Sequence, residues 1–255
     1  MFRGFFFALI TWFLCLNSQA QVKPNLSNDA GSTLNVLYRN DVSGLFYANS
    51  RGYGAVIRRG FHKTYKLRSF YEFDLQFLHH NKEVKSVGDG EERRRFVYGK
   101  VNSVMVLRGS YGLQHTLFGK SDLKAVEVRY HYSLGPLLAL AKPYYVQVYR
   151  SVSGSNTSIL VPVAFSTQGD ATDSSKIAGR APFSQGLNQL GFYPGVNAKF
   201  SISFEYANYT NLIRAIETGI SFDFYPRALP IMLRNNAENF MLTFNVGLVF
   251  GKKWY

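Results

Sequence analysis

The histidines are the side chains of this 255-residue sequence whose type most readily supports catalysis or metal binding. A catalytic or metal site needs a histidine close to a second ligand, a nucleophile or a carboxylate. Adjacent strand residues point to opposite faces, so His79 and His80 form neither a chelate nor a dyad. Only His131 lies within a strongly alternating run, while His62 and His115 fall in predicted turns. We therefore predict a non-enzymatic protein with no catalytic residue, no metal site and no cofactor.

Charged residues show a clearer pattern, because they alternate with apolar residues in short runs. Glu127 and Arg129, for example, occupy the face opposite Val128 and Tyr130. In a small barrel that polar face points into the lumen, where a lone charge is costly. We predict an interlocked network of ion pairs in the lumen, made of Arg58, Glu72, Asp74, Arg108, Glu127, Arg129, Lys199, Glu205, Glu217 and Asp223. The alternative is a narrow selective channel, which needs a wider barrel.

The elements that must position these charges are strands of period two. Strong alternation marks Tyr71–Phe77, Ala125–Leu134, Ala198–Tyr206, Ile216–Phe224 and Asn239–Tyr255, and weaker runs are Thr33–Arg39, Gly44–Asn49, Tyr53–Arg59, Val104–Leu113 and Leu138–Tyr149. A tilted strand of about nine to eleven residues crosses a bilayer. The sequence therefore predicts an all-β protein with a single antiparallel transmembrane β-barrel of outer-membrane type and about ten strands, with eight as the alternative count.

The last run carries the longest apolar face. Its even-numbered residues are almost all large and apolar, whereas a core strand of a soluble sandwich, the alternative, is rarely so long and aromatic. We interpret it as the closing strand. We further predict that the barrel-assembly machinery recognises Phe244, Val246, Leu248, Phe250, Trp254 and Tyr255.

The N-terminus has the pattern of a cleavable signal peptide. Arg3 precedes an apolar run, and Ser18-Gln19-Ala20 supplies small residues at the cleavage positions. Residues 1–20 are thus predicted to be removed, leaving 21–255 as one exported domain. Cys15, the only cysteine, leaves with the signal peptide. The mature chain carries 28 − 16 = +12 charges, which favour phosphorylated lipid headgroups over nucleic acid, unless they only solvate the loops.

Connection lengths give an orientation, because such barrels keep short turns in the periplasm and long loops outside. With both ends in the periplasm, the turns at residues 50–52, 135–136 and 208–211 are predicted to be periplasmic. The segments 150–195 and 226–238 then lie outside. The charged connection at residues 81–97 is the exception that this count places in the periplasm.

The predicted extracellular loop at 150–195 has two halves. We expect residues 166–176 to be mobile and exposed, because they are rich in Ser, Thr and Asp. We expect residues 182–193 to pack on the barrel rim with Phe183 and Leu187 facing inward. The predicted contacts, with the barrel or with a partner, are Arg180, Phe183, Leu187 and Tyr193.

Several motifs carry a resemblance to a known family. They are G-R-A-P-F from Gly179 followed by G-L-N, Y-P-G from Tyr193, Y-P-R-A-L-P-I-M from Tyr225, and the terminal F-G-K-K-W-Y. In these the chain resembles a family of outer-membrane β-barrel proteins from the Bacteroidota. The resemblance implies an outer-membrane location, and it transfers no functional residues because that family has no established activity.

The favoured hypothesis for function is a structural or interaction role in the outer membrane. The protein would serve as an accessory subunit of an envelope export, surface-assembly or barrel-assembly complex. The alternative is a narrow small-solute channel, and a third is a lipid-modifying enzyme of the rim. Expected partners are outer-membrane lipid and lipopolysaccharide, the barrel-assembly machinery and an envelope protein complex, with no nucleic acid.

Overall fold

A computed structural model describes residues 38–64, 66–80, 82–87, 94–119, 125–151, 158–165, 176–207, 211–233 and 238–254. The predicted signal peptide, Tyr255, and most of the predicted mobile segment lie outside the described residues. Within the described ranges, no helix has the length and apolar character needed to cross a membrane.

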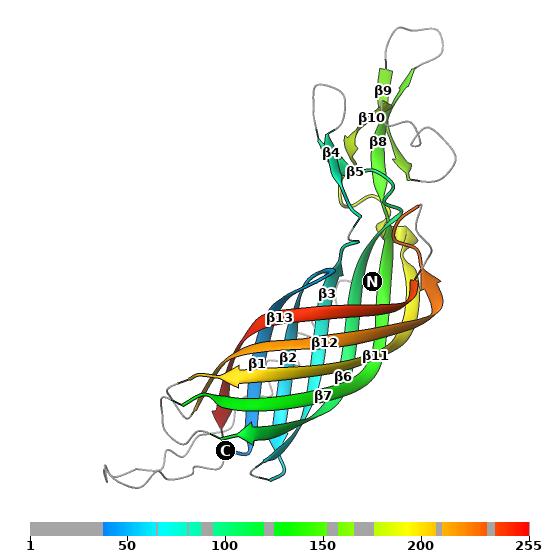
Figure 1. Cartoon of the computed structure of the whole chain (residues 1–255). Helices are drawn as coiled ribbons and strands as arrows, with labels where there is room; N and C mark the ends of the chain where they lie inside the picture. The colour runs from blue at the N-terminus through cyan, green and yellow to red at the C-terminus, as the bar shows by residue number, and fades with distance from the viewer. Residues whose placement is uncertain are drawn as a thin grey trace, which may run out of the picture. The chain divides into compact units, whose positions relative to one another are not determined.

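Eight antiparallel strands close into a barrel in the order β1, β13, β12, β11, β7, β6, β3, β2 (Figure 1). They are β1 (Asn40–Asn49), β2 (Gly52–His62), β3 (Leu67–Leu78), β6 (Asn102–Phe118), β7 (Glu127–Pro143), β11 (Gly191–Glu205), β12 (Leu212–Leu229) and β13 (Glu238–Trp254). The barrel closes where β1 pairs with β13, from Asn40 opposite Trp254 to Asn49 opposite Asn245. Closure leaves no strand edge unpaired in the barrel.

The predicted antiparallel barrel is thus confirmed, and the strand count is the alternative value of eight. Two predictions account for the difference. Most of the expected strand at 33–39 lies outside the described residues, and Tyr38 and Arg39 are not in a strand. The expected turn at Gly135-Pro136 is wrong, because β7 runs through both residues.

The backbone around Gly135 explains why β7 continues through a glycine and a proline. Pro136 has no N–H to donate, and the ladder between β6 and β7 passes from Arg108 opposite Leu137 to Tyr111 opposite Leu134 without pairing the residues between them. A Cβ at Gly135 would lie 2.0 Å from the carbonyl oxygen of Gly109. The two strands therefore approach closely here, and glycine permits the approach.

The corrected strand count also corrects the orientation of two connections. Without a strand before β1, residues 50–51 and residues 79–101 lie at the same end of the barrel as 144–190 and 230–237, and we call this the loop end. The opposite end, which we call the terminal end, holds Asn40, Trp254 and the connections 63–66, 119–126 and 206–211. The charged connection at 81–97 therefore lies at the same end as the other long connections. The turn at 50–52, which was expected at the end that holds the termini, lies at the opposite end.

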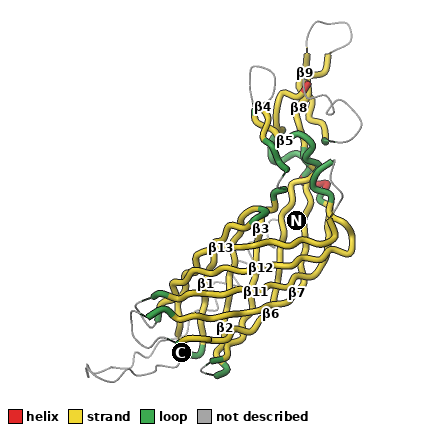
Figure 2. Tube along the Cα trace, in the orientation of Figure 1, coloured by secondary structure: helices red, strands yellow, loops and turns green. Residues whose placement is uncertain are grey.

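The connections at the loop end form small sheets of their own (Figure 2). β4 (Lys85–Val87) pairs with β5 (Arg95–Val97), and β8 (Tyr145–Ser151) lies between β9 (Ser158–Ala164) and β10 (Ile177–Arg180). One short 3-10 helix, η4 (Leu187–Gln189), precedes β11. Their buried core consists of Phe96, Tyr144, Val146, Val148, Phe165 and Ile177. We call these elements the loop-end sheets.

Strand β9 is an edge of the three-stranded sheet, and its sequence protects that edge. The N–H of Phe165 donates to the carbonyl of Tyr144, just before β8. The register of β8 with β9 then points the backbone N–H positions of Leu160, Pro162 and Ala164 away from β8, toward the free edge. Pro162 thus sits where its missing N–H would otherwise be offered to another strand. A proline at this position opposes strand addition by a partner.

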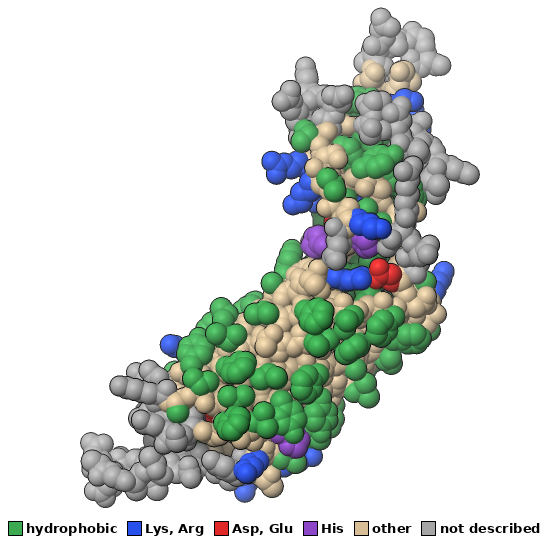
Figure 3. Space-filling view, in the orientation of Figure 1, with side chains coloured by type: hydrophobic (Ala, Val, Ile, Leu, Met, Phe, Trp, Pro, Cys, Tyr) green, Lys and Arg blue, Asp and Glu red, His purple; other side chains and the backbone are tan. Residues whose placement is uncertain are grey.

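The outer surface of the barrel is apolar. In Figure 3 the hydrophobic side chains spread over the barrel strands, whereas Lys and Arg lie mainly near its two ends. Every barrel strand contributes exposed apolar residues, among them Phe46, Ile57, Phe73, Tyr111, Leu134, Val196, Ile216 and Phe244. Their outward position follows from the alternation seen in the sequence.

We predict that Gly135→Ala destabilises the barrel by about 1 to 3 kcal/mol, because the added methyl group meets the backbone of Gly109. The matched control is Gly109→Ala, where an added Cβ has no atom within 4 Å. The measurement is the temperature at which the folded band of the detergent-solubilised protein shifts on a gel. Equal shift temperatures for the two variants would contradict the close approach.

Candidate functional site

The middle of the lumen is held by the guanidinium group of Arg58. It donates to Oε2 of Glu72 at 2.9 and 3.1 Å and to Oε2 of Glu217 at 2.9 Å. Lys199 Nζ lies 3.7 Å from Glu72 and 3.6 Å from Glu217, so two cations face two anions. The Nε2 atom of His131 is 3.2 Å from Glu217. All five side chains are buried, and each charge is compensated locally.

A second group lies around Arg108. Its guanidinium donates to Asp223 and Asp74, with Nε–Oδ1 and Nη1–Oδ2 distances of 3.1 Å each. The hydroxyl of Tyr47 donates to Asp74 at 2.7 Å, and the amide of Asn197 donates to Asp223 at 2.6 Å. Tyr47 thus satisfies the Asp74 oxygen that Arg108 does not reach, and Asn197 adds a second donor to the Oδ1 atom of Asp223.

A third group fills the lumen at the terminal end. Arg129 donates to Glu127 at 2.7 and 2.8 Å and lies 2.7 Å from Oε2 of Glu205. Lys253 donates to the other oxygen of Glu205 at 2.8 Å. The structure thus places all ten charges predicted for the lumen in these three groups of ion pairs.

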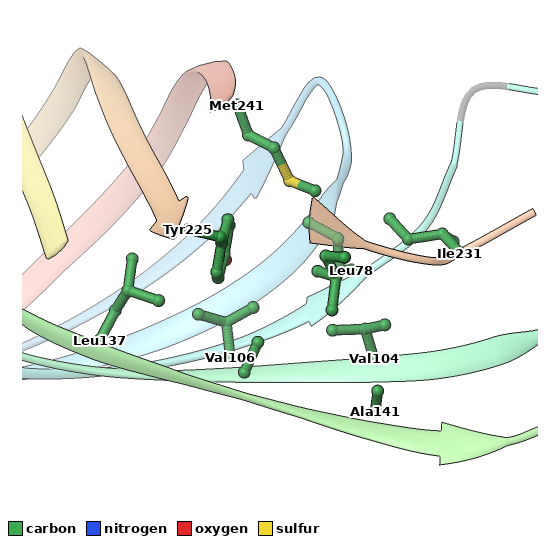
Figure 4. Packing of buried hydrophobic residues seen from close by; sticks show 10 residues of the cluster. Leu78, Val104, Val106, Leu137, Ala141, Tyr225, Ile231 and Met241 are labelled. Carbon is green, nitrogen blue, oxygen red and sulfur yellow. The ribbon is translucent and has the colours of Figure 1, made fainter. Parts of the chain in front are cut away.

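Toward the loop end the lumen becomes apolar. Tyr225, Met241, Leu137 and Val106 project inward from four different strands and pack together (Figure 4). The rest of this cluster is Leu78, Val104, Ala139, Ala141, Leu229 and Ile231. Its members are almost completely buried. An apolar layer above three charged groups leaves the described lumen filled with side chains along its length.

Some lumen residues were not among the predicted ones. Asp41 pairs with Arg68 at 2.7 Å, and Gln76 accepts a hydrogen bond from Arg108 at 2.5 Å. Gln76 shares its strand face with Glu72 and Asp74, so the alternation could have found it. Asp41 lies before the run predicted as a strand, and Lys253 follows a break in the apolar pattern, so their signal was weak.

The histidines are spread over several places. His131 belongs to the lumen group of Arg58, whereas the ring of His115 stacks on that of Tyr130 at 5.0 Å between centroids on the outer surface. His80 lies at the loop end, where its Nδ1 accepts from the N–H of Lys82. Burial lowers the pKa of His80, although Glu238 opposes this effect. The described residues contain no cluster of His, Cys, Asp and Glu that could hold a metal ion.

The segment from Pro182 to Leu190 packs on the rim, but not as predicted. Lys142 Nζ lies 4.0 Å from the ring centroid of Phe183 and donates to its backbone carbonyl. The hydroxyl of Tyr145 donates to Gln189 at 2.8 Å. Phe183 is 67% exposed and Leu187 43% exposed, so the expectation that both face inward is wrong. The contact with the Lys142 ammonium group leaves most of the Phe183 ring exposed to solvent.

The other two predicted contact residues differ from these. Tyr193 is partly buried against the apolar lumen cluster, and Arg227 lies 5.6 Å from its ring centroid. Arg180 is exposed at the end of β10. Of the predicted assembly residues, Phe244, Val246, Leu248 and Phe250 are exposed on the outer face of β13.

The geometry defines a closed β-barrel of the transmembrane type, apolar outside and filled with ion pairs inside. No family model matches the sequence, and no curated protein matches it either.

Among solved structures, the chain is similar to Neisserial surface protein A, with 9% identity, a TM-score of 0.44 and coverage of 85% of this chain and 97% of that one. It is similar to the Yersinia pestis attachment invasion locus protein Ail, solved in complex with the heparin analogue sucrose octasulfate, with 9% identity, a TM-score of 0.42 and coverage of 86% and 100%. It is also similar to the N-terminal β-barrel domain of Pseudomonas aeruginosa OprF, with 11% identity, a TM-score of 0.36 and coverage of 84% and 99%.

We predict that Arg58→Met lowers the free energy of unfolding by about 3 to 5 kcal/mol, because Glu72 and Glu217 lose their shared partner in the lumen. Adding Glu217→Gln to this variant removes one of the two carboxylates left without their arginine partner. We expect the double variant to regain part of the lost free energy of unfolding. Urea unfolding in detergent measures both. Independent, additive effects of the two substitutions would show that the network is not coupled.

Proposed function

We propose that the protein is an integral outer-membrane barrel that serves as an anchor and presents the loop-end sheets as a binding surface outside the cell. The observation that carries this proposal is the buried core of the loop-end sheets, built from Phe96, Tyr144, Val146, Val148, Phe165 and Ile177. Connections that only link strands need no core of their own. A folded unit above a filled barrel favours display over transport.

The outer surface supports the membrane location. The barrel strands are 10 to 18 residues long, which is enough to cross a bilayer. Aromatic rings meet near both ends of the apolar surface, as the membrane interface favours. Tyr71 lies 5.1 Å from Tyr111 between centroids near the terminal end, and Tyr53 lies 5.6 Å from Phe77 near the loop end.

Polar contacts fasten the connections at the loop end to one another and to the rim of the barrel. Lys100 Nζ binds Glu83 at 2.8 and 2.9 Å, and Arg51 pairs with Glu238. The N–H of Val101 donates to the carbonyl of Ile231 at 2.9 Å, which joins two connections. A surface held in this way is pre-organised for a partner, which lowers the entropic cost of binding.

The kind of partner follows from the same surface. Pro162 opposes strand addition at β9, so we expect recognition through exposed side chains such as Ile159 and Leu160. An envelope export, surface-assembly or barrel-assembly complex would supply such a partner, with this protein as an accessory subunit. Co-purification from native membranes tests that role, and recovery of the barrel alone would count against it.

The predicted topology can be tested by cysteine labelling, because the only cysteine, Cys15, lies in the predicted signal peptide. We expect Gln185→Cys, at the loop end, to react with a membrane-impermeant maleimide on intact cells. Lys63→Cys, at the terminal end, should react only after the outer membrane is opened. The reverse pattern would show an inverted barrel, and equal labelling of both would show that the protein does not span the membrane.

Conductance measurements distinguish the proposed anchor from the alternative function, a narrow channel. The filled lumen predicts that the purified barrel leaves a planar bilayer silent, because ion pairs and the apolar layer occupy its cross-section. Stable single-channel steps from the folded protein would overturn the anchor proposal in favour of a narrow pore.

A further inference from the structure

Cationic side chains gather around one pocket at the loop end. Arg94, Arg95, Arg180, Ala181 and Pro182 line a pocket of about 310 Å³. A smaller pocket of about 90 Å³ shares Arg180, Ala181 and Pro182 with it. The smaller pocket adds Lys142 and Ser103 from the rim of the barrel. The two hollows together form one site with cations from β5, β10 and β7, which we call the arginine pocket.

The backbone brings these cations together. A Cβ at Gly179 would lie 2.5 Å from the Cβ of Arg94 and 2.7 Å from its carbonyl oxygen. Gly179 also has a φ of +154°. Only glycine allows β10 to approach the start of β5 this closely, and the approach sets Arg180 beside Arg94 and Arg95. The G-R-A-P-F motif thus has a structural purpose, which is to build one wall of the pocket.

Two cations of the arginine pocket, Arg95 and Arg180, form no ion pair with a carboxylate of the described residues. Two carboxylates of the loop end are already paired, Glu83 with Lys100 and Glu238 with Arg51. Like charges held together repel, so a site of this kind gains stability when an anion enters it.

The position of the pocket indicates which anion it meets. Lys142 is the last residue but one of β7, where it follows Leu138 and Leu140 on the outward face of the strand. The exposed ring of Phe183 lies beside it, and the exposed Phe192 begins the outer face of β11. Cations just above an apolar belt lie at the depth of lipid headgroups, where Lys and Arg bind phosphate.

We propose that the arginine pocket binds the phosphate groups of a phosphorylated lipid headgroup in the outer leaflet. Arg95 and Arg180 supply planar forks of donors that match phosphate oxygens, and Lys142 adds a point charge. Phe183 rests at the interface beside the acyl chains. This inference rests on the proposed function, because it requires the loop end to face outward.

The test uses the full-length folded protein in detergent, with bisphosphorylated lipid A as the probe and its dephosphorylated form as the reference. Arg95→Gln with Arg180→Gln is expected to weaken binding of the phosphorylated lipid about tenfold. The matched control is Arg39→Gln with Arg214→Gln, which removes two exposed arginines at the terminal end. It should stay within about twofold of the unaltered protein. A heat-induced gel shift verifies that each variant is folded.

Several results would overturn the inference. They are equal losses in the two double variants, equal binding of phosphorylated and dephosphorylated lipid, and displacement of the lipid by inorganic phosphate as effectively as by lipid A itself. The last result would assign the pocket to a free anion. Because binding is measured in detergent, it does not depend on orientation. Phosphate-dependent binding combined with inverted cysteine labelling would therefore refute the proposed topology and not the site.

Discussion

The narrow interior of an eight-stranded barrel, which side chains largely fill, is the constraint on which the rest of this structure depends. Strand closure turns every second side chain into the lumen, and any charge there must find a partner within the barrel. Arg58, Arg108 and Arg129 meet this demand, because each of them contacts the carboxylates of two different residues. Guanidinium suits the role because its planar donors bridge two carboxylates at once. The lumen is thereby a cross-linked core rather than a passage.

The charge network and the apolar layer divide the length of the lumen between them. Ion pairs fill the part from the terminal end to Arg108, and aliphatic and aromatic side chains such as Leu137 and Tyr225 fill the loop end. This division has a consequence for the loop-end sheets. They adjoin a barrel end that is packed like a soluble protein core, which gives these small sheets a firm base.

The outer surface of the barrel must be apolar, because lipid replaces water as the solvent there. Exposed Phe, Leu, Val and Ile on all eight strands would be an aggregation hazard in water, and are the expected surface in a bilayer. Cations are accordingly concentrated beyond the apolar surface. At the loop end, Arg95 and Arg180 line one pocket, and Arg180 and Lys142 line the pocket next to it. The apolar anchoring surface and the proposed binding site therefore adjoin each other.

The sequence by itself determined the class of fold, because the period-two alternation states which residues face lipid and which face the lumen. It put Glu72, Glu127 and Glu217 on the same faces as the cations that they meet. The sequence did not determine the strand count, because Gly135-Pro136 has the composition of a turn. Only the tertiary structure shows that the backbone of Gly109 approaches Gly135 closely and that one strand continues through both residues. Pairing partners such as Arg58 with Glu217, 159 residues apart, depend on strand register around the closed barrel. The arginine pocket likewise arises only when β5, β10 and β7 fold together, because nothing local in the chain links Arg95 to Arg180.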